Sequence, residues 1–499
     1  MRFIFLLYVL GMLTSTSLVG QTYVGEVFYR SGYEYLKIVV TDTSALVSLP
    51  YLDGRASYPL LGQRSGGDYF LRKGQRWDLD LDKKTTNCAG TLLLKGQRQS
   101  VTLWKQQPPL EESALPTYEG VFQDSTGQRT VIYAENGYLH MMSPYSERTM
   151  SLKPIGEHRF WTVSGVVWEF LPSDTVFQIE FRNGSRRSLQ RLPKSNVEEH
   201  WIPYQQDTLY AKVFYPPTTR QSPACLVLPG GGSVGMKNYE YEARYFAAQG
   251  LVAMVFDKSG NGLSKGNGDF RRQTFTEKLD QYTALYRYVQ QLPQVDAQRV
   301  GVHGPSEGGR LALMMAGTIP EMAFANATAA PIMTMREGQL YAVAHYHRQL
   351  GLSEGAINDI VSLWNDYYEG IIEEDIPETV IERANRFRNL HERMFLPPNS
   401  TQVPASPSAE DLKNNTVVTH LSQINCPVFL QYGENDERVH ASASIRNFKQ
   451  HIAPNVLYRI EEYPRANHSF MTPEFEISHG YLDDKLVWLQ QIGILKQSP

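Results

Sequence analysis

The chain has 499 residues and a formal net charge of −4, which indicates a globular protein of more than one domain. No lysine- or arginine-rich stripe runs along the sequence, so its charge does not indicate nucleic acid as a partner. Its 3 cysteines leave at least one unpaired and exclude a disulfide framework. Two of them lie in apolar strand-like stretches, and we expect both to be buried. The cysteines are Cys88, Cys225 and Cys426.

The N-terminus has the pattern of a secretory signal peptide. Arg2 precedes the apolar run 3–13, and small and polar residues follow up to Gln21, which predicts cleavage near residue 20. The run is too short to span a bilayer, and no cysteine near the cleavage point offers a site for a lipid. The rest of the chain lacks an apolar segment of membrane length, so we expect a periplasmic or secreted protein, with an uncleaved anchor as the alternative.

Residues 21–110 carry only β signals and predict an N-terminal β domain. Asp78, Asp80 and Asp82 alternate in one of these stretches, which raises the question of a calcium site. However, Lys83 follows where a calcium loop of the EF-hand type needs its glycine, and alternate residues of a strand share one face. A solvated strand edge is therefore the better interpretation.

Residues 111–195 predict a second small β domain, a barrel or a sandwich. Hairpin turns are expected at 136–137 and 183–184, where asparagine precedes glycine, between aromatic strands. Neither β region offers a nucleophile, a metal cluster or a phosphate-binding loop, so the sequence does not reveal what they do.

From about residue 199 the pattern changes to short apolar strands that alternate with helical stretches. This alternation predicts a mostly parallel sheet covered by helices on both faces. The expected strands are 209–215, 224–228, 251–256, 300–303, 325–331, 427–432 and 456–460, and the expected helices include 239–248, 276–292 and 311–316.

A glycine-flanked serine stands between one of these strands and the helix after it. The stretch Gly304-Pro305-Ser306-Glu307-Gly308 has the spacing of a nucleophile elbow, in which a strained turn projects the serine hydroxyl above the sheet. The two glycines leave room where side chains would collide with neighbouring backbone. The backbone N–H of Glu307 begins the helix and is expected to stabilise an oxyanion.

A glycine-rich loop follows the strand that ends near Leu228. Gly230, Gly231 and Gly232 stand where a second oxyanion donor is needed, and glycines let backbone N–H groups approach a substrate carbonyl. A phosphate-binding loop is the alternative, but the lysine and serine or threonine of a Walker motif are missing. The stretch 257–264 predicts a structural turn beside the site.

Residues 335–408 interrupt the strand pattern with helical and proline-rich sequence, which predicts a helical cap over the carboxyl edge of the sheet. Trp364, Tyr367 and Tyr368 are expected either to line the substrate pocket or to pack within the cap. His345 and His347 have no carboxylate or cysteine nearby and are poor candidates for metal ligands.

Two further residues follow predicted strands in the order that a catalytic triad requires. Asp436 comes after the strand 427–432, and His468 comes after the strand 456–460. With Ser306 they give the order Ser, Asp, His, in which His468 would transfer the serine proton and Asp436 would orient the imidazole. Glu434, on the same loop as Asp436, is the alternative acid.

These motifs resemble bacterial α/β-hydrolases of the serine-aminopeptidase-like and dienelactone-hydrolase-like kind, many of which are carboxylesterases. The resemblance covers about residues 200–495 and is sharpest at Ser306-Glu307-Gly308-Gly309. It implies an α/β-hydrolase fold with a mostly parallel sheet and a helical cap insertion, preceded here by two small antiparallel β domains. Two positions depart from the family's pattern. Pro305 stands where histidine is frequent in the family, and Lys258-Ser259 stands where a charged residue and an arginine are usual. The resemblance therefore does not specify the substrate.

The sequence thus predicts an exported serine hydrolase that acts on ester or related acyl bonds through an acyl-Ser306 intermediate, without metal or cofactor. Its partner would be a small-molecule ester or a short peptide. An aminopeptidase-like or dipeptidyl-peptidase-like enzyme is the alternative, with Glu307 or residues 369–374 as an acidic anchor for a substrate amine. A non-catalytic binding protein that uses its β domains is a third reading. The oligomeric state is open.

Overall fold

The structure of the chain is a computed structural model. Residues 1–20, which carry the predicted signal peptide, lie outside the described part. The described residues are 21–29, 32–40, 45–48, 57–60, 62–65, 68–71, 77–80, 87–94, 97–135, 137–142, 150–162, 166–171, 176–180, 185–193, 196–218, 220–233, 235–388, 394–404, 408–472 and 477–496.

The N-terminal region forms an antiparallel sheet of nine strands in the order β4-β3-β2-β1-β9-β8-β7-β6-β5. Asp78 and Asp80 lie in β7, whereas Asp82 falls outside the described residues, as do Asn136 of the first predicted turn and the whole of the second turn, 183–184. The strands are β1 Gln21–Tyr29, β2 Gly32–Val40, β3 Ala45–Ser48, β4 Ser57–Leu60, β5 Gly62–Ser65, β6 Asp68–Leu71, β7 Trp77–Asp80, β8 Asn87–Leu94 and β9 Gln97–Lys105.

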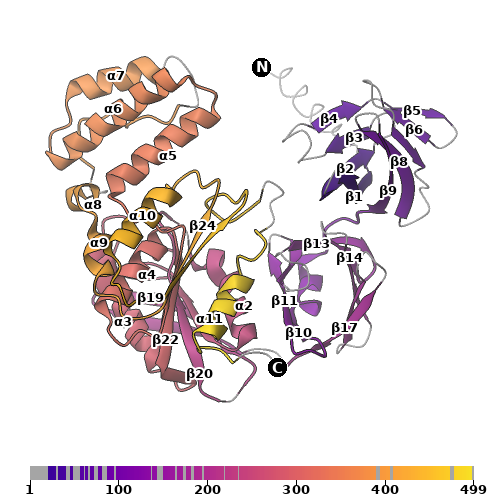
Figure 1. The fold of residues 1–499 in the computed structure, drawn as a ribbon, viewed down its shortest axis with the longest axis horizontal. Helices are drawn as coiled ribbons and strands as arrows, with labels where there is room; N and C mark the ends of the chain where they lie inside the picture. The colour runs from indigo at the N-terminus through magenta and orange to yellow at the C-terminus, as the bar shows by residue number, and fades with distance from the viewer. Residues whose placement is uncertain are drawn as a thin grey trace, which may run out of the picture. The chain divides into compact units, whose positions relative to one another are not determined.

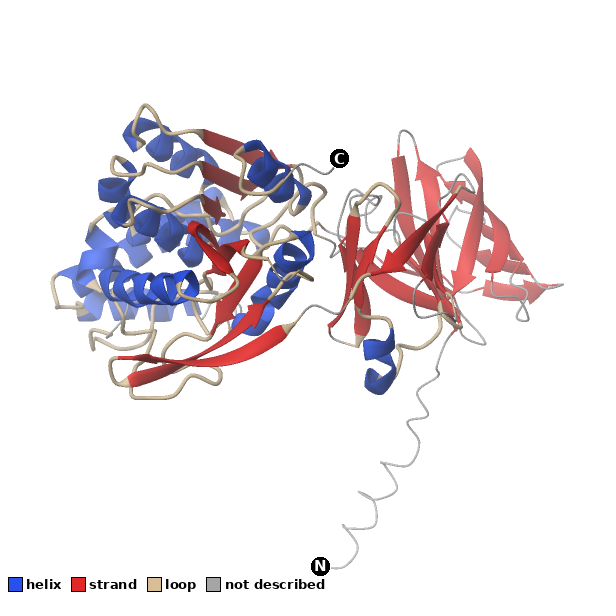
Figure 2. Cartoon of the chain, turned by 90° about the horizontal axis from the view of Figure 1, so that it is seen from below, coloured by secondary structure: helices blue, strands red, loops and turns tan. Residues whose placement is uncertain are grey.

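A closed barrel of the strands β10 to β17 follows, after the short helix η1 (Glu112–Thr117). Among the structures that the sequence left open, the barrel is therefore the one observed (Figure 2). The chain forms two compact units whose boundary runs through this barrel, and the domain limits near residues 110 and 195 stay a prediction. The barrel strands are β10 Gly120–Gln123, β11 Arg129–Glu135, β12 Tyr138–Met142, β13 Met150–Gly156, β14 Arg159–Trp161, β15 Val167–Phe170, β16 Val176–Glu180 and β17 Arg186–Arg191.

The third sheet has eight strands in the order β18-β19-β21-β20-β22-β23-β24-β25 (Figure 1). The pairs β18·β19 and β19·β21 are antiparallel, and every pair from β21 to β25 is parallel, as the alternation of strands and helices predicts. The strands are β18 Val197–Tyr204, β19 Asp207–Phe214, β20 Ser222–Val227, β21 Val252–Phe256, β22 Val295–Pro305, β23 Ala325–Thr328, β24 Val428–Gly433 and β25 Tyr458–Tyr463.

Helices cover both faces of this sheet and bury its apolar side chains (Figure 1). Residues of α3, α4, α9 and α10 pack on one face and residues of α2 and α11 on the other, so the fold is the doubly covered sheet that the resemblance implies. Cys225 and Cys426 are unpaired and buried, as expected. These helices are α2 Glu240–Gln249, α3 Phe275–Gln290, α4 Glu307–Thr318, α9 Thr416–Leu421, α10 Ala441–His451 and α11 Asp483–Gln491, with η2 at Met236–Tyr239.

The predicted insertion, residues 335–408, contains the helices α5 (Met335–Gln349), α6 (Glu354–Ile372) and α7 (Glu378–Arg388), and the short helix α8 (Ala409–Lys413) follows directly after it. They pack around a core of their own, which includes Trp364, Tyr367 and Tyr368. Of the two readings of these aromatic residues, packing within the cap is therefore the one observed. Helix α5 begins with a capping box, in which the Thr334 hydroxyl accepts from the Glu337 N–H and the Glu337 carboxylate accepts from the Thr334 N–H.

Candidate active site

The carboxyl ends of the parallel strands bring the predicted site residues to one edge of the third sheet. Ser306 directly follows β22, the glycine loop 230–232 follows β20, Asp436 follows β24 and His468 follows β25. In an open α/β sheet this edge is where ligands bind. The topology thus gathers residues that lie far apart in the sequence.

Ser306 stands at a strained turn. Its backbone angles are φ 55° and ψ −119°, in a region that side chains other than glycine rarely occupy. The turn is held because the Ser306 N–H donates to Thr328 O at 2.8 Å and the Arg310 N–H donates to Ser306 O at 3.0 Å. This is the strand–turn–helix geometry of a nucleophile elbow.

The glycines around Ser306 are required by close backbone contacts. A Cβ on Gly304 would lie 2.5 Å from the carbonyl carbon and oxygen of Gly308. A Cβ on Gly308 would lie 2.7 Å from Leu228 O and 2.8 Å from Pro229 O. The elbow therefore packs directly against the strand end that leads into the glycine loop.

Asp436 and His468 form a hydrogen-bonded pair. His468 Nδ1 lies 2.9 Å from Oδ2 and 3.0 Å from Oδ1 of Asp436, and the aspartate side chain is buried. Backbone N–H groups of Arg438 and Val439 each donate to Asp436 Oδ1 at 2.8 Å, which fixes the carboxylate. Glu434, the alternative acid, instead accepts the Arg465 N–H at 2.9 Å.

Ser306 and His468 are not hydrogen-bonded to each other among the described residues. The structure thus brings Asp436 and His468 together and places Ser306 at the same sheet edge, without a hydrogen bond between Ser306 and the imidazole among the described residues. Catalytic hydrogen bonds are often long before substrate binds and tighten in the complex.

The oxyanion donors expected from the sequence divide into two groups. Glu307 begins α4, so its backbone N–H has no acceptor within the helix, and Gly231 and Gly232 line the pocket beside Ser306. Gly230 differs from the expectation, because its N–H donates to the Tyr239 hydroxyl at 2.8 Å. Its N–H is thus already bonded in this structure.

Lys258 binds carbonyl oxygens of the glycine loop, a contact that the sequence did not reveal. Its buried Nζ donates to Gly230 O at 2.8 Å and to Gly232 O at 2.5 Å, and it lies 4.4 Å from the centre of the Phe270 ring. Burial lowers the pKa of Lys258 to about 8. By binding Gly230 O, Lys258 fixes the peptide plane that carries the N–H of Gly231, one of the predicted oxyanion donors. The only signal in the sequence was its departure from the family pattern.

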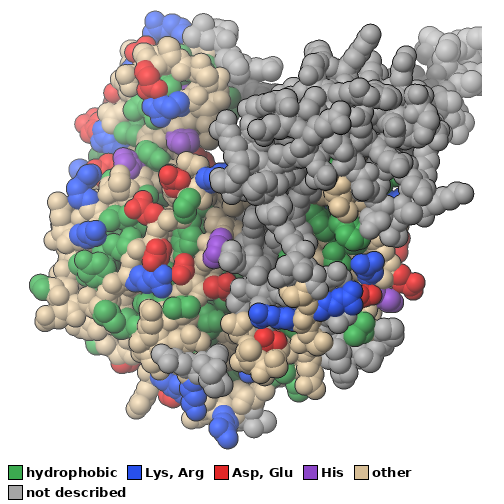
Figure 3. Space-filling model, turned by 45° about the vertical axis from the view of Figure 1, so that its right-hand side comes forward, with side chains coloured by type: hydrophobic (Ala, Val, Ile, Leu, Met, Phe, Trp, Pro, Cys, Tyr) green, Lys and Arg blue, Asp and Glu red, His purple; other side chains and the backbone are tan. Residues whose placement is uncertain are grey.

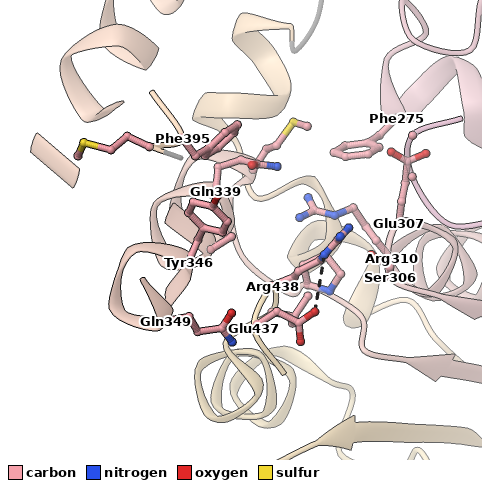
Figure 4. A pocket seen from close by; sticks show the side chains of 18 residues that line it. Phe275, Ser306, Glu307, Arg310, Gln339, Tyr346, Gln349, Phe395, Glu437 and Arg438 are labelled. Carbon is pink, nitrogen blue, oxygen red and sulfur yellow. Dashed lines mark ion pairs between the residues drawn. The ribbon is translucent and has the colours of Figure 1, made fainter. Parts of the chain in front are cut away.

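A pocket of about 960 Å³ opens at Ser306. Residues at the sheet edge, among them Ser306 and Glu307, line one part of the pocket, and cap residues, among them Tyr346 and Phe395, line another (Figure 4). This size suits a small-molecule substrate. The lining residues from the cap are Met335, Gly338, Gln339, Ala342, Tyr346, Gln349, Met394 and Phe395.

Two of the carboxylates predicted as possible anchors for a substrate amine, Glu307 and Glu369, form ion pairs. Glu307 Oε1 lies 2.8 Å from Lys278 Nζ, and Glu369 Oε2 lies 2.6 Å from Arg336 Nη1.

On the face drawn in Figure 3, basic and acidic side chains are interspersed over the described residues. Among the described residues, no group of three or more His, Cys, Asp or Glu side chains is arranged to hold a metal ion. No helix in this described part is long and apolar enough to cross a membrane.

Comparisons with known proteins found one curated relative and several solved structures with similarity to this chain. Acyl-coenzyme A thioesterase 3 of Mus musculus is 27% identical over 200 residues, which are 36% of this chain and 43% of that protein, so the chain spans less than half of this relative's length. Acetyl xylan esterase 1 from Thermoanaerobacterium sp. JW/SL YS485 has 17% identity and a TM-score of 0.36, over 60% of this chain and 89% of that one. Proline iminopeptidase of Mycobacterium smegmatis has 19% identity and a TM-score of 0.38, over 59% and 98%.

The family comparison covers the region that carries the site. Residues 220–474 match the family described as serine aminopeptidase, S33. This range begins just before β20 and ends after His468, so it contains the glycine loop, the elbow and the Asp436–His468 pair. The chain belongs to the serine aminopeptidase S33 family of α/β-hydrolases and is a hydrolase.

Proposed function

We propose that the chain is an exported serine hydrolase, a carboxylesterase that cleaves ester or related acyl bonds through an acyl-Ser306 intermediate. The observation that carries the proposal is the hydrogen bond of His468 to the buried Asp436, at the sheet edge where Ser306 occupies a strained elbow. A serine hydroxyl is a weak nucleophile until a neighbouring base takes its proton. The elbow supplies the serine hydroxyl, and the Asp436–His468 pair supplies the base.

The reaction follows from these positions. Ser306 Oγ attacks the carbonyl carbon while His468 Nε2 accepts the hydroxyl proton, and Asp436 stabilises the imidazolium and keeps Nδ1 protonated. The oxyanion receives hydrogen bonds from the backbone N–H groups of Glu307 and Gly231. His468 then protonates the leaving alcohol. A water molecule, deprotonated by His468, hydrolyses the acyl-enzyme and restores the serine.

An aminopeptidase-like reaction is less well supported by the charges of the site. An aminopeptidase has to hold the substrate ammonium with a carboxylate, and the Glu307 carboxylate is engaged by Lys278 while Glu369 is engaged by Arg336. A thioester is the closer alternative, because the chain is similar to an acyl-coenzyme A thioesterase. It reacts by the same acyl-Ser306 route.

A substrate panel tests the proposal. Purified protein is assayed with 4-nitrophenyl esters of two to twelve carbons, acyl-coenzyme A thioesters and aminoacyl 4-nitroanilides. We expect ester hydrolysis in the wild type and a loss of about 10⁴-fold or more in kcat in Ser306→Ala. Faster turnover of the anilides than of the esters contradicts the esterase proposal. Equal rates in the two proteins contradict serine catalysis, and absence of turnover in the wild type favours the binding-protein reading.

Export is tested separately. The apolar run 3–13 after Arg2 supports a cleaved signal peptide. Expressed with its own N-terminus in a bacterium with two membranes, the protein should appear in the periplasm or medium, and its first residue should lie near residue 21. Recovery with Met1 intact in the cytoplasm contradicts export.

A further inference from the structure

A single buried arginine stands at the wall of the pocket next to the elbow. Arg310 lies one turn into α4, and its backbone N–H donates to Ser306 O at 3.0 Å, so its position is tied to that of the serine. The residue is only 2% exposed. Figure 4 shows its guanidinium extending from α4 toward the interior of the pocket, on the side of Phe275.

Most hydrogen-bonding capacity of this guanidinium is unused. Nη2 donates to Met333 O at 2.9 Å, and the group lies 4.6 Å from the centre of the Phe275 ring. Nε and Nη1 are buried and have no hydrogen-bond partner in the part of the chain that the structure describes. Buried N–H groups without a partner are rare, since each costs the free energy of its lost hydration. Such a group at a pocket wall is paired when a ligand supplies an oxygen.

The carboxylates near Arg310 do not neutralise it by contact. Glu307 is bound by Lys278 at 2.8 Å, and no carboxylate among the described residues forms an ion pair with Arg310. Glu307 and Asp411 stabilise the guanidinium only from a distance. Burial lowers the pKa of Arg310 to about 10, so it stays a cation at neutral pH. The other arginine that lines the pocket, Arg438, has a 70% exposed side chain.

We propose that Arg310 is a specificity residue that binds a carboxylate of the substrate, so that the enzyme prefers esters that carry an acidic group. The inference rests on the proposed function, and it names the substrate class of the same site. Nε and Nη1 are the free donors, and two donors on one guanidinium suit the two oxygens of a carboxylate. The strained elbow and the recognition group thus share the first turn of one helix, which fixes their separation.

Pairs of esters that differ only in the acidic group test the proposal. On the acyl side, mono-4-nitrophenyl glutarate is compared with 4-nitrophenyl pentanoate, in which a methyl group replaces the carboxylate. On the leaving-group side, 4-acetoxybenzoate is compared with its methyl ester. We expect Arg310→Met to lower kcat/KM for the acidic member of one pair by about 10- to 100-fold relative to its neutral partner. Arg310→Lys should retain part of the preference. The pair whose kcat/KM ratio changes shows whether Arg310 binds a carboxylate on the acyl side or on the leaving-group side of the ester bond.

Controls separate this proposal from the proposed function and from misfolding. Arg348→Gln alters an arginine on α5 whose side chain is 53% exposed and paired with Glu354. This variant should keep the wild-type ratio of kcat/KM between the acidic and the neutral ester of each pair. If Arg310→Met does not fold, the wild type is assayed for competitive inhibition of neutral-ester hydrolysis by glutarate and by pentanamide. Inhibition by glutarate alone supports the proposal. Equal loss for both members of each pair, or no stronger inhibition by glutarate, overturns it. Absence of any Ser306-dependent turnover contradicts the proposed function instead.

Discussion

At the scale of single residues, Lys258 is the side chain with the most to add to the expected site. It touches no predicted catalytic group, yet it binds two carbonyl oxygens of the glycine loop. Replacement by methionine, of similar length, should let the loop turn and weaken the oxyanion contacts. We expect Lys258→Met to lower kcat by about 10- to 100-fold with little change in KM, since the contacts strengthen in the transition state. Steady-state kinetics with a neutral ester check this, and an unchanged kcat contradicts it.

The buried amine also predicts a pH dependence of stability. The pKa of Lys258 is about 8 in the folded protein, against roughly 10.4 in an unfolded chain. Between these values the unfolded state binds more protons, so the free energy of unfolding rises with pH. Below about pH 8 both states are protonated and this contribution stays constant. Urea midpoints at pH 7.5 and 10 should therefore show a smaller rise in Lys258→Met than in the wild type. An identical rise in both proteins contradicts the assignment.

The glycines of the elbow offer a test of packing. Because a Cβ on Gly304 would lie 2.5 Å from the Gly308 carbonyl, we expect Gly304→Ala to lower the free energy of unfolding by about 2 kcal/mol or more. Gly355, in α6, has nothing within 4 Å of the corresponding position. Gly355→Ala should therefore be neutral or stabilising by up to about 1 kcal/mol. Urea unfolding compares the two, and a Gly304→Ala protein as stable as Gly355→Ala contradicts the close packing.

Residue types and their order were enough to predict Ser306, Asp436 and His468 as candidates, because each follows a short apolar strand. Contacts that depend on tertiary packing were not predictable. Lys258 binds a loop 26 to 28 residues earlier in the chain, and no local pattern marks that pairing. The same holds for the Gly230 N–H, which Tyr239 occupies, and for the unpaired nitrogens of Arg310.

At the scale of elements, the cap helix α5 contacts both the pocket and the loop that carries Asp436, the predicted acid of the triad. The Tyr341 hydroxyl donates to Asp436 O at 2.9 Å, and Tyr346, on the same helix, lines the pocket. Helix α5 thus stabilises the loop that carries Asp436, and side chains of the same helix line the pocket. The sequence predicted an insertion at 335–408 from the loss of strand signals. It did not predict which aromatic residues face the pocket, since α6 is apolar on the side that packs within the cap.

Tyr346 is the cap residue whose removal should change acyl-chain selectivity. It is 39% exposed and packs edge-on against Phe395, so Tyr346→Ala enlarges the pocket at its outer wall. We expect kcat/KM for an octanoate ester to rise relative to that for a butyrate ester by about 10-fold. The matched control is Tyr458→Ala, on β25 and 40% exposed, which does not line the pocket. A ratio that moves equally in both variants contradicts this role.

The strand bearing the elbow is held by a buried charged cluster. His303 of β22 lies 3.0 Å from Glu242 of α2, and Glu242 also accepts from Lys485 of α11 at 2.6 Å and from Tyr481 at 2.7 Å. Burial alone would raise the pKa of Glu242, but His303 and Lys485 hold it below its usual value. We expect Lys485→Met to lower the free energy of unfolding by about 3 kcal/mol, because it leaves a buried carboxylate without its cation. Thermal unfolding checks this, and an unchanged midpoint contradicts it.

At the scale of the whole molecule, the alternation of strands and helices was sufficient to predict a doubly covered parallel sheet. The strand order and the antiparallel edge β18·β19 were not predictable, because they depend on long-range pairing. The N-terminal sheet and the barrel were predicted only as β structure, since alternation specifies a half-buried strand and leaves its partners open. All three predicted catalytic residues follow strands of the third sheet.

The central claim is that Ser306 is a nucleophile activated by His468 and Asp436. Reaction with a fluorophosphonate, followed by intact-protein mass spectrometry and peptide mapping, tests it most directly. The wild type should gain one adduct, located on Ser306, and His468→Ala and Asp436→Asn should react far more slowly. Ser306→Ala should gain none. A wild type that stays unlabelled, or an adduct that persists in Ser306→Ala, would contradict the account.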